Sequence, residues 1–250
     1  MIDLYCERVD ASFWAEPINA LTNIGFLLSG YLMLVTLRRN KHASDTHLLL
    51  PLLCIVIGLG SFLFHTFATN WARWLDIIPI LLFQLAFLWL YARNIIHLPV
   101  VVSLMSLLIY LGVALYCRGF PDILNGSLIY APALLVLFSL GMWHYSHQLS
   151  RPTILLSASL IFLLSVSFRA MDNLICDVFP IGSHFLWHLL NALVLYLCSL
   201  SLLPAGINRS PAAENSSGRV SKHMQDKAEH KQKSQMTACM EVHQVSGRYT

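Results

Sequence analysis

Gly182-Ser183-His184-Phe185-Leu186-Trp187-His188 opens an apolar segment that continues from Leu189 to Leu203 and is long enough to cross a bilayer. His184 and His188 are four residues apart, so in a helix their side chains lie on one face, one turn apart. An imidazole is costly in hydrocarbon, which makes intramembrane histidines rare and usually functional. Two histidines on one face indicate a metal site. A third protein ligand would leave zinc with one open position, as in catalytic zinc sites.

Composition places the chain among membrane proteins with several spans. Hydrophobic residues make up 56% of its 250 residues and charged residues 12%, whereas soluble domains carry about 25% charged residues. The formal net charge of +3 comes from the C-terminal tail, because residues 205–250 hold seven Lys and Arg against four Asp and Glu. That mild excess fits the anionic cytoplasmic leaflet of a membrane, and we expect no nucleic-acid partner.

Seven apolar segments predict an all-α membrane protein, a bundle of seven transmembrane helices. The expected spans are 18–37, 48–67, 74–91, 98–116, 127–145, 151–168 and a last one that opens at His184. Gly58 and Gly60 in the second span would permit close helix contact. Residues 1–204 form the membrane domain in this interpretation. Residues 205–250 are polar and lack apolar periodicity, which predicts a disordered tail.

The distribution of charge predicts the orientation of the bundle. With seven spans, the loops after the first, third and fifth spans share a side with the tail and carry Arg38, Arg39, Lys41, Arg93 and Arg151. The positive-inside rule then places the tail in the cytoplasm and the N-terminus outside or in a lumen. Eight of the nine acidic residues before the tail fall on the N-terminal side. We therefore expect the functional site on that side.

Five polar residues are expected to meet at that end of the bundle. His65 lies near the exit of the second span, level with His184 and His188 at the entrance of the seventh. Ser61 precedes His65 by four residues and shares its face. Asp76 follows at the top of the third span. Two helices can thus direct three imidazoles to one ion, with a hydroxyl and a carboxylate beside it.

This set of groups is suited to metal-assisted hydrolysis. Zinc on three neutral imidazoles lowers the pKa of its water to about 7 and polarises a carbonyl oxygen. Asp76 is the candidate to take the proton of the water and pass it to the leaving group. The hydroxyl of Ser61 is the candidate donor to the developing oxyanion. A site at bilayer depth points to a lipid substrate.

Each residue alone also has a structural interpretation. His65 could be an interfacial or hydrogen-bonded histidine, Ser61 a helix-packing residue and Asp76 a helix N-cap. At the level of function, the alternative to an enzyme is a seven-span receptor or sensor with a structural zinc. A transporter fits less well because the chain shows no internal repeat. The open fourth position beside Asp76 and Ser61 favours the enzyme.

Several short motifs occur in an order that resembles the alkaline ceramidases, seven-span zinc hydrolases related to the adiponectin receptors. The motifs are Tyr5-Cys6-Glu7, Ala15-Glu16-Pro17-Ile18-Asn19, Ser61-Phe62-Leu63-Phe64-His65, Asp76, Asp172-Asn173-Leu174-Ile175-Cys176 and His184-Phe185-Leu186-Trp187-His188. They cover most of the membrane domain. The compact loops are similar to those of bacterial members, which implies the bacterial inner membrane. A eukaryotic member would imply an endoplasmic reticulum or Golgi membrane.

The resemblance implies a set of roles. Zinc would be bound by His65, His184 and His188, with Asp76 as acid and base and Ser61 as transition-state stabiliser. The reaction would be hydrolysis of the amide of ceramide to a sphingoid base and a fatty acid, or of another N-acyl lipid in a bacterial member. A disulfide would join Cys6 to Cys176, on the side where disulfides persist.

The resemblance also implies a calcium site that this chain matches only in part. Glu7 and Glu16 correspond to two of its carboxylates. Leu4 and Val9 stand where the family has an acid and an amide, and calcium requires six to eight oxygen ligands. Glu7 and Glu16 are therefore the candidate calcium ligands, with polar caps of the helix ends as the alternative interpretation. The oligomeric state is left open by the sequence.

Overall fold

This computed structural model describes residues 1–40 and 45–203. Most of these residues belong to seven helices that are long and apolar enough to cross a membrane. They confirm the predicted all-α bundle of seven spans, and no strand occurs in these two ranges. The predicted tail, 205–250, lies outside the described residues.

The helices follow the apolar segments closely. Helices α1 (Pro17–Thr22) and α2 (Ile24–Arg39) share the first span, and the others are α3 (Leu49–Phe67), α4 (Asn70–Asn94), α5 (Val100–Arg118), α6 (Ala131–Ser146), α7 (Ile154–Met171) and α8 (His184–Ser201). Short 3₁₀ turns occur at Asp45–Leu48, Ser127–Tyr130 and Asp172–Leu174. The expected third span, 74–91, is shorter than helix α4. The sequence did not show how short the turn is: Ala68 ends α3 with a left-handed φ of 47°, and α4 begins two residues later.

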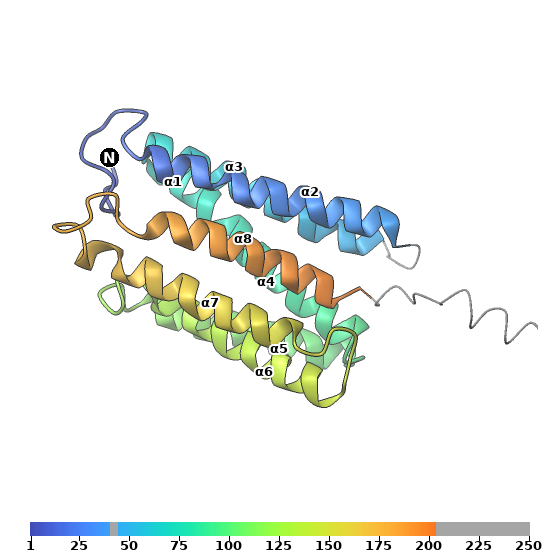
Figure 1. Cartoon of the computed structure of the whole chain (residues 1–250). Helices are drawn as coiled ribbons and strands as arrows, with labels where there is room; N and C mark the ends of the chain where they lie inside the picture. Colours follow the sequence, from blue (N-terminus) through green and yellow to red (C-terminus); the bar gives the residue numbers. More distant parts are fainter. Residues whose placement is uncertain (41–44, 204–250) are drawn as a thin grey trace, which may run out of the picture. The chain divides into compact units, whose positions relative to one another are not determined.

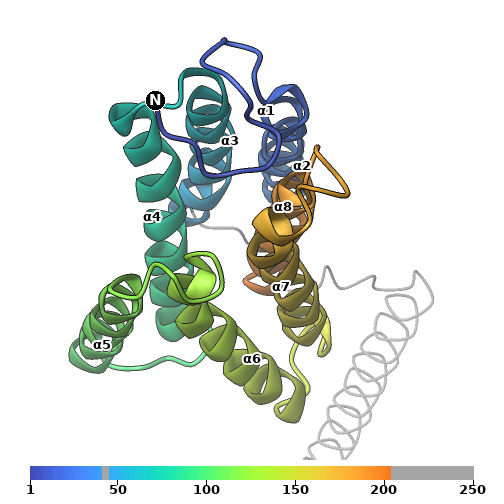
Figure 2. The ribbon, with the colours of Figure 1, turned by 90° about the vertical axis from the view of Figure 1, so that its left-hand side faces the viewer.

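Neighbouring spans pack against each other in chain order, and α8 closes the bundle against α2 and α7 (Figures 1 and 2). Helix α8 also contacts α1 and α3. It has the largest buried share of the seven spans, 56% of its most apolar window. The last helix is therefore surrounded by other helices near its N-terminal end, where the histidines lie.

Gly60 allows α3 and α4 to approach closely. A Cβ atom on Gly60 would overlap the backbone carbonyl oxygen of Leu75 in α4. Residue 79 is a proline inside α4, so the carbonyl of Leu75 lacks the N–H that would normally bond to it within the helix. That carbonyl faces the bare Cα of Gly60. The sequence predicted close helix contact at this glycine, and the contact brings the neighbouring residues Ser61 and Asp76 near each other.

The N-terminal head, residues 1–16, covers the end of the bundle seen in Figure 2. The N–H of Ile2 donates to the carbonyl oxygen of Ala68, at 2.8 Å. A disulfide joins Cys6 to Cys176, in the segment between α7 and α8, which confirms the predicted pairing. The head is therefore fixed both to the end of α3 and to the segment that leads into α8.

The segment before α8 is held by Asp172. Its buried carboxylate accepts hydrogen bonds from the N–H groups of Cys6 (3.0 Å), Ser183 (2.6 Å) and His184 (2.9 Å). Gly182 has a φ of +68°, and a Cβ there would overlap Oδ1 of Asp172. Asp172 thus satisfies otherwise unbonded amides at the start of α8, and the glycine makes room for it.

The close contact at Gly60 predicts a stability difference between two Gly→Ala variants. Gly60→Ala forces α3 away from Leu75 and should lower the free energy of unfolding by about 1–3 kcal/mol or more. Gly112, also inside a span, has open space where the methyl group of an alanine would lie, with nothing within 4 Å. Gly112→Ala should leave stability equal or raise it, by up to about 1 kcal/mol. Thermal unfolding midpoints in one detergent compare the two variants, and equal midpoints would contradict the packing argument.

Candidate metal centre

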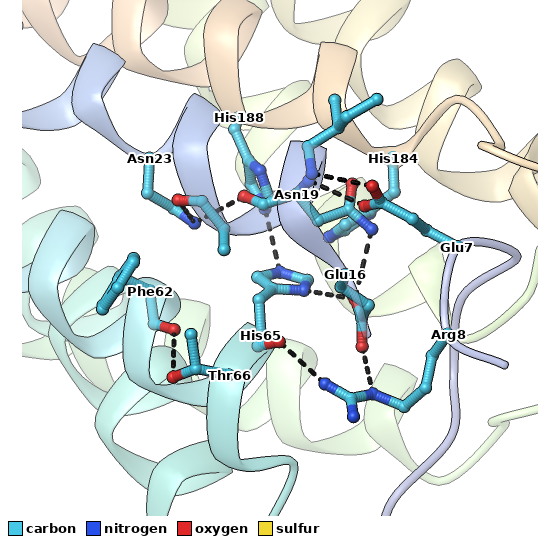
Figure 3. Close-up of polar contacts among 12 residues, drawn as sticks. Glu7, Arg8, Glu16, Asn19, Asn23, Phe62, His65, Thr66, His184 and His188 are labelled. Carbon is cyan, nitrogen blue, oxygen red and sulfur yellow. Dashed lines mark hydrogen bonds and ion pairs between the residues drawn. The ribbon is translucent and has the colours of Figure 1, made fainter. Parts of the chain in front are cut away.

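Three buried histidines meet near the N-terminal end of the bundle (Figure 3). His65 comes from the last turn of α3, and His184 and His188 come from the first two turns of α8. One ligand atom of each lies within 4.8 Å of the other two. The structure therefore brings together the three residues that the sequence proposed as metal ligands.

Hydrogen bonds to the outer nitrogens determine which nitrogens face the centre. Nδ1 of His65 donates to Oε2 of Glu16 at 2.5 Å. Nδ1 of His188 lies 2.9 Å from the hydroxyl oxygen of Thr22, which uses its own proton toward the carbonyl oxygen of Ile18, at 2.8 Å. The hydroxyl of Thr22 must therefore accept from Nδ1 of His188. When both rings are neutral, as metal binding requires, the proton is on Nδ1 and Nε2 carries a free lone pair.

The two lone pairs point at each other. Nε2 of His65 and Nε2 of His188 are 3.1 Å apart, and in the neutral rings neither holds a proton to share. Such a contact is repulsive unless a cation lies beside both atoms. Two nitrogens on one tetrahedral zinc, each at about 2.0–2.1 Å, are separated by about 3.3–3.4 Å. In addition, Nδ1 of His184 is buried without a hydrogen-bond partner. These observations fit a zinc ion.

Glu16 anchors His65 and is itself neutralised by a buried arginine. Its carboxylate is bonded to Nε of Arg8 and to the side-chain amide of Asn19. Arg8 also donates to the backbone carbonyl of His65 at 2.7 Å. Burial raises the pKa of Glu16, but the hydrogen bonds and charges of His65 and Arg8 outweigh it and hold the pKa below its usual value. Glu16 is therefore an anion at neutral pH, and it increases the basicity of His65 as a ligand.

The ring of His184 is positioned by packing. It stacks on Tyr5, with ring centroids 3.6 Å apart and an interplanar angle of 16°. Its backbone N–H is fixed by Asp172. Tyr5 belongs to the head that the disulfide at Cys6 ties down. The N-terminal head thus contributes to the orientation of a ligand in the last span.

The proposed calcium carboxylates both have partners within the chain. Glu7 accepts hydrogen bonds from the N–H groups of Ile18 (2.7 Å) and Asn19 (2.8 Å), which satisfies the first turn of α1. Burial raises the pKa of Glu7 despite these bonds. Glu16 bonds to Arg8, Asn19 and His65 as described. The interpretation of Glu7 as a cap matches this geometry, and calcium binding stays a prediction.

A cavity of about 370 Å³ borders the histidines, within the size range of ligand sites. His184 and His188 line it, together with Ser61 and Asp76. Asp76 lies in the second turn of α4, so it is not the N-cap that the alternative interpretation suggested. Four of the five residues expected around one point therefore face one cavity, with His65 adjacent.

Sequence reasoning missed three residues that hold the centre. Thr22 orients His188, Arg8 neutralises Glu16, and Asp172 caps α8. Asp172 belongs to a motif noted in the sequence, and Arg8 is the residue after Glu7. Arg8 is only 4% exposed and Asp172 0%, which could not be read from the sequence. Among the described residues, the histidines are the only group of three or more His, Cys, Asp or Glu in reach of one ion.

A family model described as Ceramidase matches residues 4–215. This range includes the head from Leu4 onward, all seven spans and every site residue described above. A comparison with curated proteins finds no match.

The bond between Thr22 and His188 predicts the effect of Thr22→Val on metal affinity. The substitution keeps the shape of the side chain and removes the hydroxyl that fixes Nδ1 of His188. Loss of such a partner costs about 10–100-fold in metal affinity. The matched control is Thr36→Val, because the hydroxyl of Thr36 is exposed and bonds only to its own helix, at Leu32.

Competition with a chelator measures the zinc affinity of the purified wild type and both variants. We expect weaker binding in Thr22→Val alone. Equal zinc affinity in Thr22→Val and Thr36→Val would contradict the role assigned to Thr22.

Proposed function

This chain belongs to the ceramidase family, and from that premise we propose that it hydrolyses the amide bond of an N-acyl lipid at a zinc ion held by His65, His184 and His188. The products are a free fatty acid and an amine, which for ceramide is a sphingoid base. One observation carries the proposal: three buried histidines, two of them with Nε2 atoms 3.1 Å apart, could hold one metal ion beside a cavity lined by Asp76 and Ser61.

Zinc bound here supplies Lewis-acid polarisation to the amide carbonyl and to the attacking water. The residues of the chain supply the proton transfers. Asp76 takes a proton from the water as it attacks the carbonyl carbon and delivers a proton to the amide nitrogen as the C–N bond breaks. The Ser61 hydroxyl, which lines the same cavity as Asp76, donates to the oxyanion that forms on the carbonyl oxygen. The amide and one water become a carboxylic acid and an amine.

Three protein ligands suit a catalytic metal. Structural zinc sites are closed by four protein ligands, whereas catalytic sites keep one position open. Within residues 1–40 and 45–203, the metal-binding group contains three histidines and no fourth ligand. This count supports the enzyme over a receptor or sensor with a structural zinc.

A narrow apolar slot offers a place for the acyl chain. A second cavity, of about 60 Å³, lies between helices α4, α6 and α8 and is lined by residues such as Phe83, Ala133 and Leu137. Ile80 of α4 lines both this slot and the larger cavity. We propose that the acyl chain runs from the metal centre past Ile80 into the slot, with the headgroup in the larger cavity.

The placement in the membrane is part of the same proposal. We propose that residues 1–204 are the membrane domain, with the N-terminus and the metal centre on the outer or luminal side and a tail, 205–250, in the cytoplasm. The disulfide between Cys6 and Cys176 supports this orientation, because such bonds persist in oxidising compartments. The bacterial inner membrane and the endoplasmic reticulum or Golgi are the candidate membranes.

Fatty-acid release from a panel of ceramides and other N-acyl lipids tests the function of the zinc-loaded protein in detergent. Asp76→Asn should lower kcat by about 100-fold or more, because it removes the proton-transfer group, while zinc content stays unchanged. His188→Ala should lose both activity and zinc. The matched control is Asp122→Asn, which changes an exposed carboxylate that does not line the cavity.

Two results would decide against the enzyme. If the wild type holds zinc but releases no fatty acid from the panel, the sensor becomes the better hypothesis. If Asp76→Asn keeps full activity, the proton-transfer role assigned to this residue is wrong.

The acyl-chain slot predicts a change in chain-length preference. Ala133→Phe adds a ring to the slot wall and should shift the preference to shorter acyl chains, because the volume of the slot is small. Leu135→Phe is the control on the same helix, since Leu135 is 66% exposed and does not line the slot. Hydrolysis of a homologous series of one N-acyl lipid measures the shift. An unchanged chain-length profile in Ala133→Phe would contradict the placement of the acyl chain.

A further inference from the structure

Three arginines line the cavity beside the metal centre. Arg73 in α4, Arg118 at the end of α5 and Arg169 in α7 border the same space as Asp76 and His188. They come from three different helices, and none of them belongs to the metal centre or to the proton transfers proposed above. All three residues line the cavity in which the headgroup of the substrate would lie.

The positive charge of these arginines is not balanced within the cavity. Asp76 is the one carboxylate among the lining residues. Two other buried carboxylates nearby are satisfied elsewhere, Glu16 by Arg8 and His65, and Asp172 by backbone amides. The cavity therefore holds more positive than negative charge before any metal is added.

Arg169 is fixed at the cavity wall without a carboxylate partner. Its Nη1 donates to the carbonyl oxygen of Asn125 (3.1 Å) and to the hydroxyl of Ser127 (2.8 Å). The guanidinium lies over the rings of Tyr130 and Trp187, at 5.3 and 5.8 Å from their centroids. Aromatic faces and neutral acceptors orient the group but leave its charge available. A guanidinium held in this way can bind a carboxylate, phosphate or sulfonate through two parallel hydrogen bonds.

The other two arginines are exposed, at the rim of the cavity. The guanidinium of Arg118 lies 5.0 Å from the ring centroid of Trp74, the residue that follows Arg73 in the first turns of α4. This contact holds the end of α5 next to the start of α4. Positive charge thus extends from the rim inward to Arg169, along the path that a headgroup would follow.

From this arrangement we propose that the lipid hydrolysed by this protein carries an anionic group, a phosphate, sulfonate or carboxylate, on the amine side of its amide bond. Arg169 binds the anion inside the cavity, and Arg73 and Arg118 attract it at the rim. This inference rests on the proposed amide hydrolysis and defines its substrate class. The reaction remains a hydrolysis: water adds to the acyl carbon, the C–N bond breaks, and the amine leaves with its anionic group attached.

Two probes that differ only in the terminal group test the proposal. An N-acylethanolamine ends in a hydroxyl, and the N-acyltaurine of the same chain length ends in a sulfonate. We expect kcat/KM of the wild type to be higher for the sulfonate probe by about tenfold or more. The hydroxyl probe lacks a charge-assisted hydrogen bond, and the free energy of such a bond corresponds to a factor of this size. The preference should appear mainly in KM and should fall as salt is added, because salt screens exposed charges.

Variants locate the preference. Arg169→Gln should bring the two kcat/KM values together by weakening the sulfonate probe alone, and Arg73→Gln and Arg118→Gln should each reduce the preference in part. The last two residues are exposed, so their variants remain informative if Arg169→Gln does not fold. Arg38→Gln, at the opposite end of the bundle, is the control and should leave the ratio unchanged.

A second arm separates an anion on the substrate from an anion on a neighbouring lipid. Adding phosphatidylglycerol to neutral detergent supplies free anionic headgroups. If the arginines bind the substrate, phosphatidylglycerol should compete with the sulfonate probe and slow it. If it instead accelerates the hydroxyl probe to the rate of the sulfonate probe, the site recognises a neighbouring lipid and the proposal is overturned.

The outcomes distinguish this proposal from the proposed function. Cleavage of the hydroxyl probe as fast as or faster than the sulfonate probe leaves amide hydrolysis standing and overturns the anionic substrate. If neither probe is cleaved, the affinities of both probes for the zinc-loaded Asp76→Asn variant are compared instead. If the sulfonate probe binds more tightly and the difference disappears when Arg169→Gln is added, the result supports anion recognition without turnover. Equal binding of the two probes overturns the proposed anion recognition.

Discussion

The short contact between Nε2 of His65 and Nε2 of His188 imposes a constraint on everything around it. When both rings are neutral, the two nitrogens repel each other at 3.1 Å, and burial removes the water that would otherwise bond to them. The chain must therefore hold both rings in place against that repulsion until a cation arrives. Glu16 and Thr22 do so through hydrogen bonds, and the stacking of Tyr5 does so for His184.

The groups that hold the histidines are connected to one another by the N-terminal head. Arg8 of the head neutralises Glu16, Glu7 satisfies the first turn of α1, and Cys6 is bonded to Cys176 and, through its N–H, to Asp172. A buried ion pair is weak evidence for stability, because desolvation offsets much of its attraction. Here the pair between Arg8 and Glu16 has a clearer consequence, since it keeps ionised the carboxylate that orients His65.

The fold and the metal ligands could be predicted from the sequence, whereas most of their supports could not. The lengths of the apolar segments are enough to predict seven spans. Because successive spans cross the membrane in opposite directions, the exit of the second span and the entrance of the seventh lie on the same side, which puts His65 level with His184 and His188. Thr22 gave no such indication, because its role depends on how α1 meets α8. Arg169 could be counted only as a flanking charge, since its position over Tyr130 and Trp187 is a product of packing. The pairing of Cys6 with Cys176 came from family resemblance and not from the residues themselves.

The contacts that complete the centre join the two ends of the described chain. Cys6 and Cys176 are separated by 170 positions, and Thr22 and His188 by 166. Contacts of such long range form late, because a long loop must close before they can contribute. During synthesis, six spans are made before His184 and His188 exist. An incomplete bundle therefore contains one of the three candidate metal ligands, and the proposed hydrolysis could begin only once the seventh span is in place.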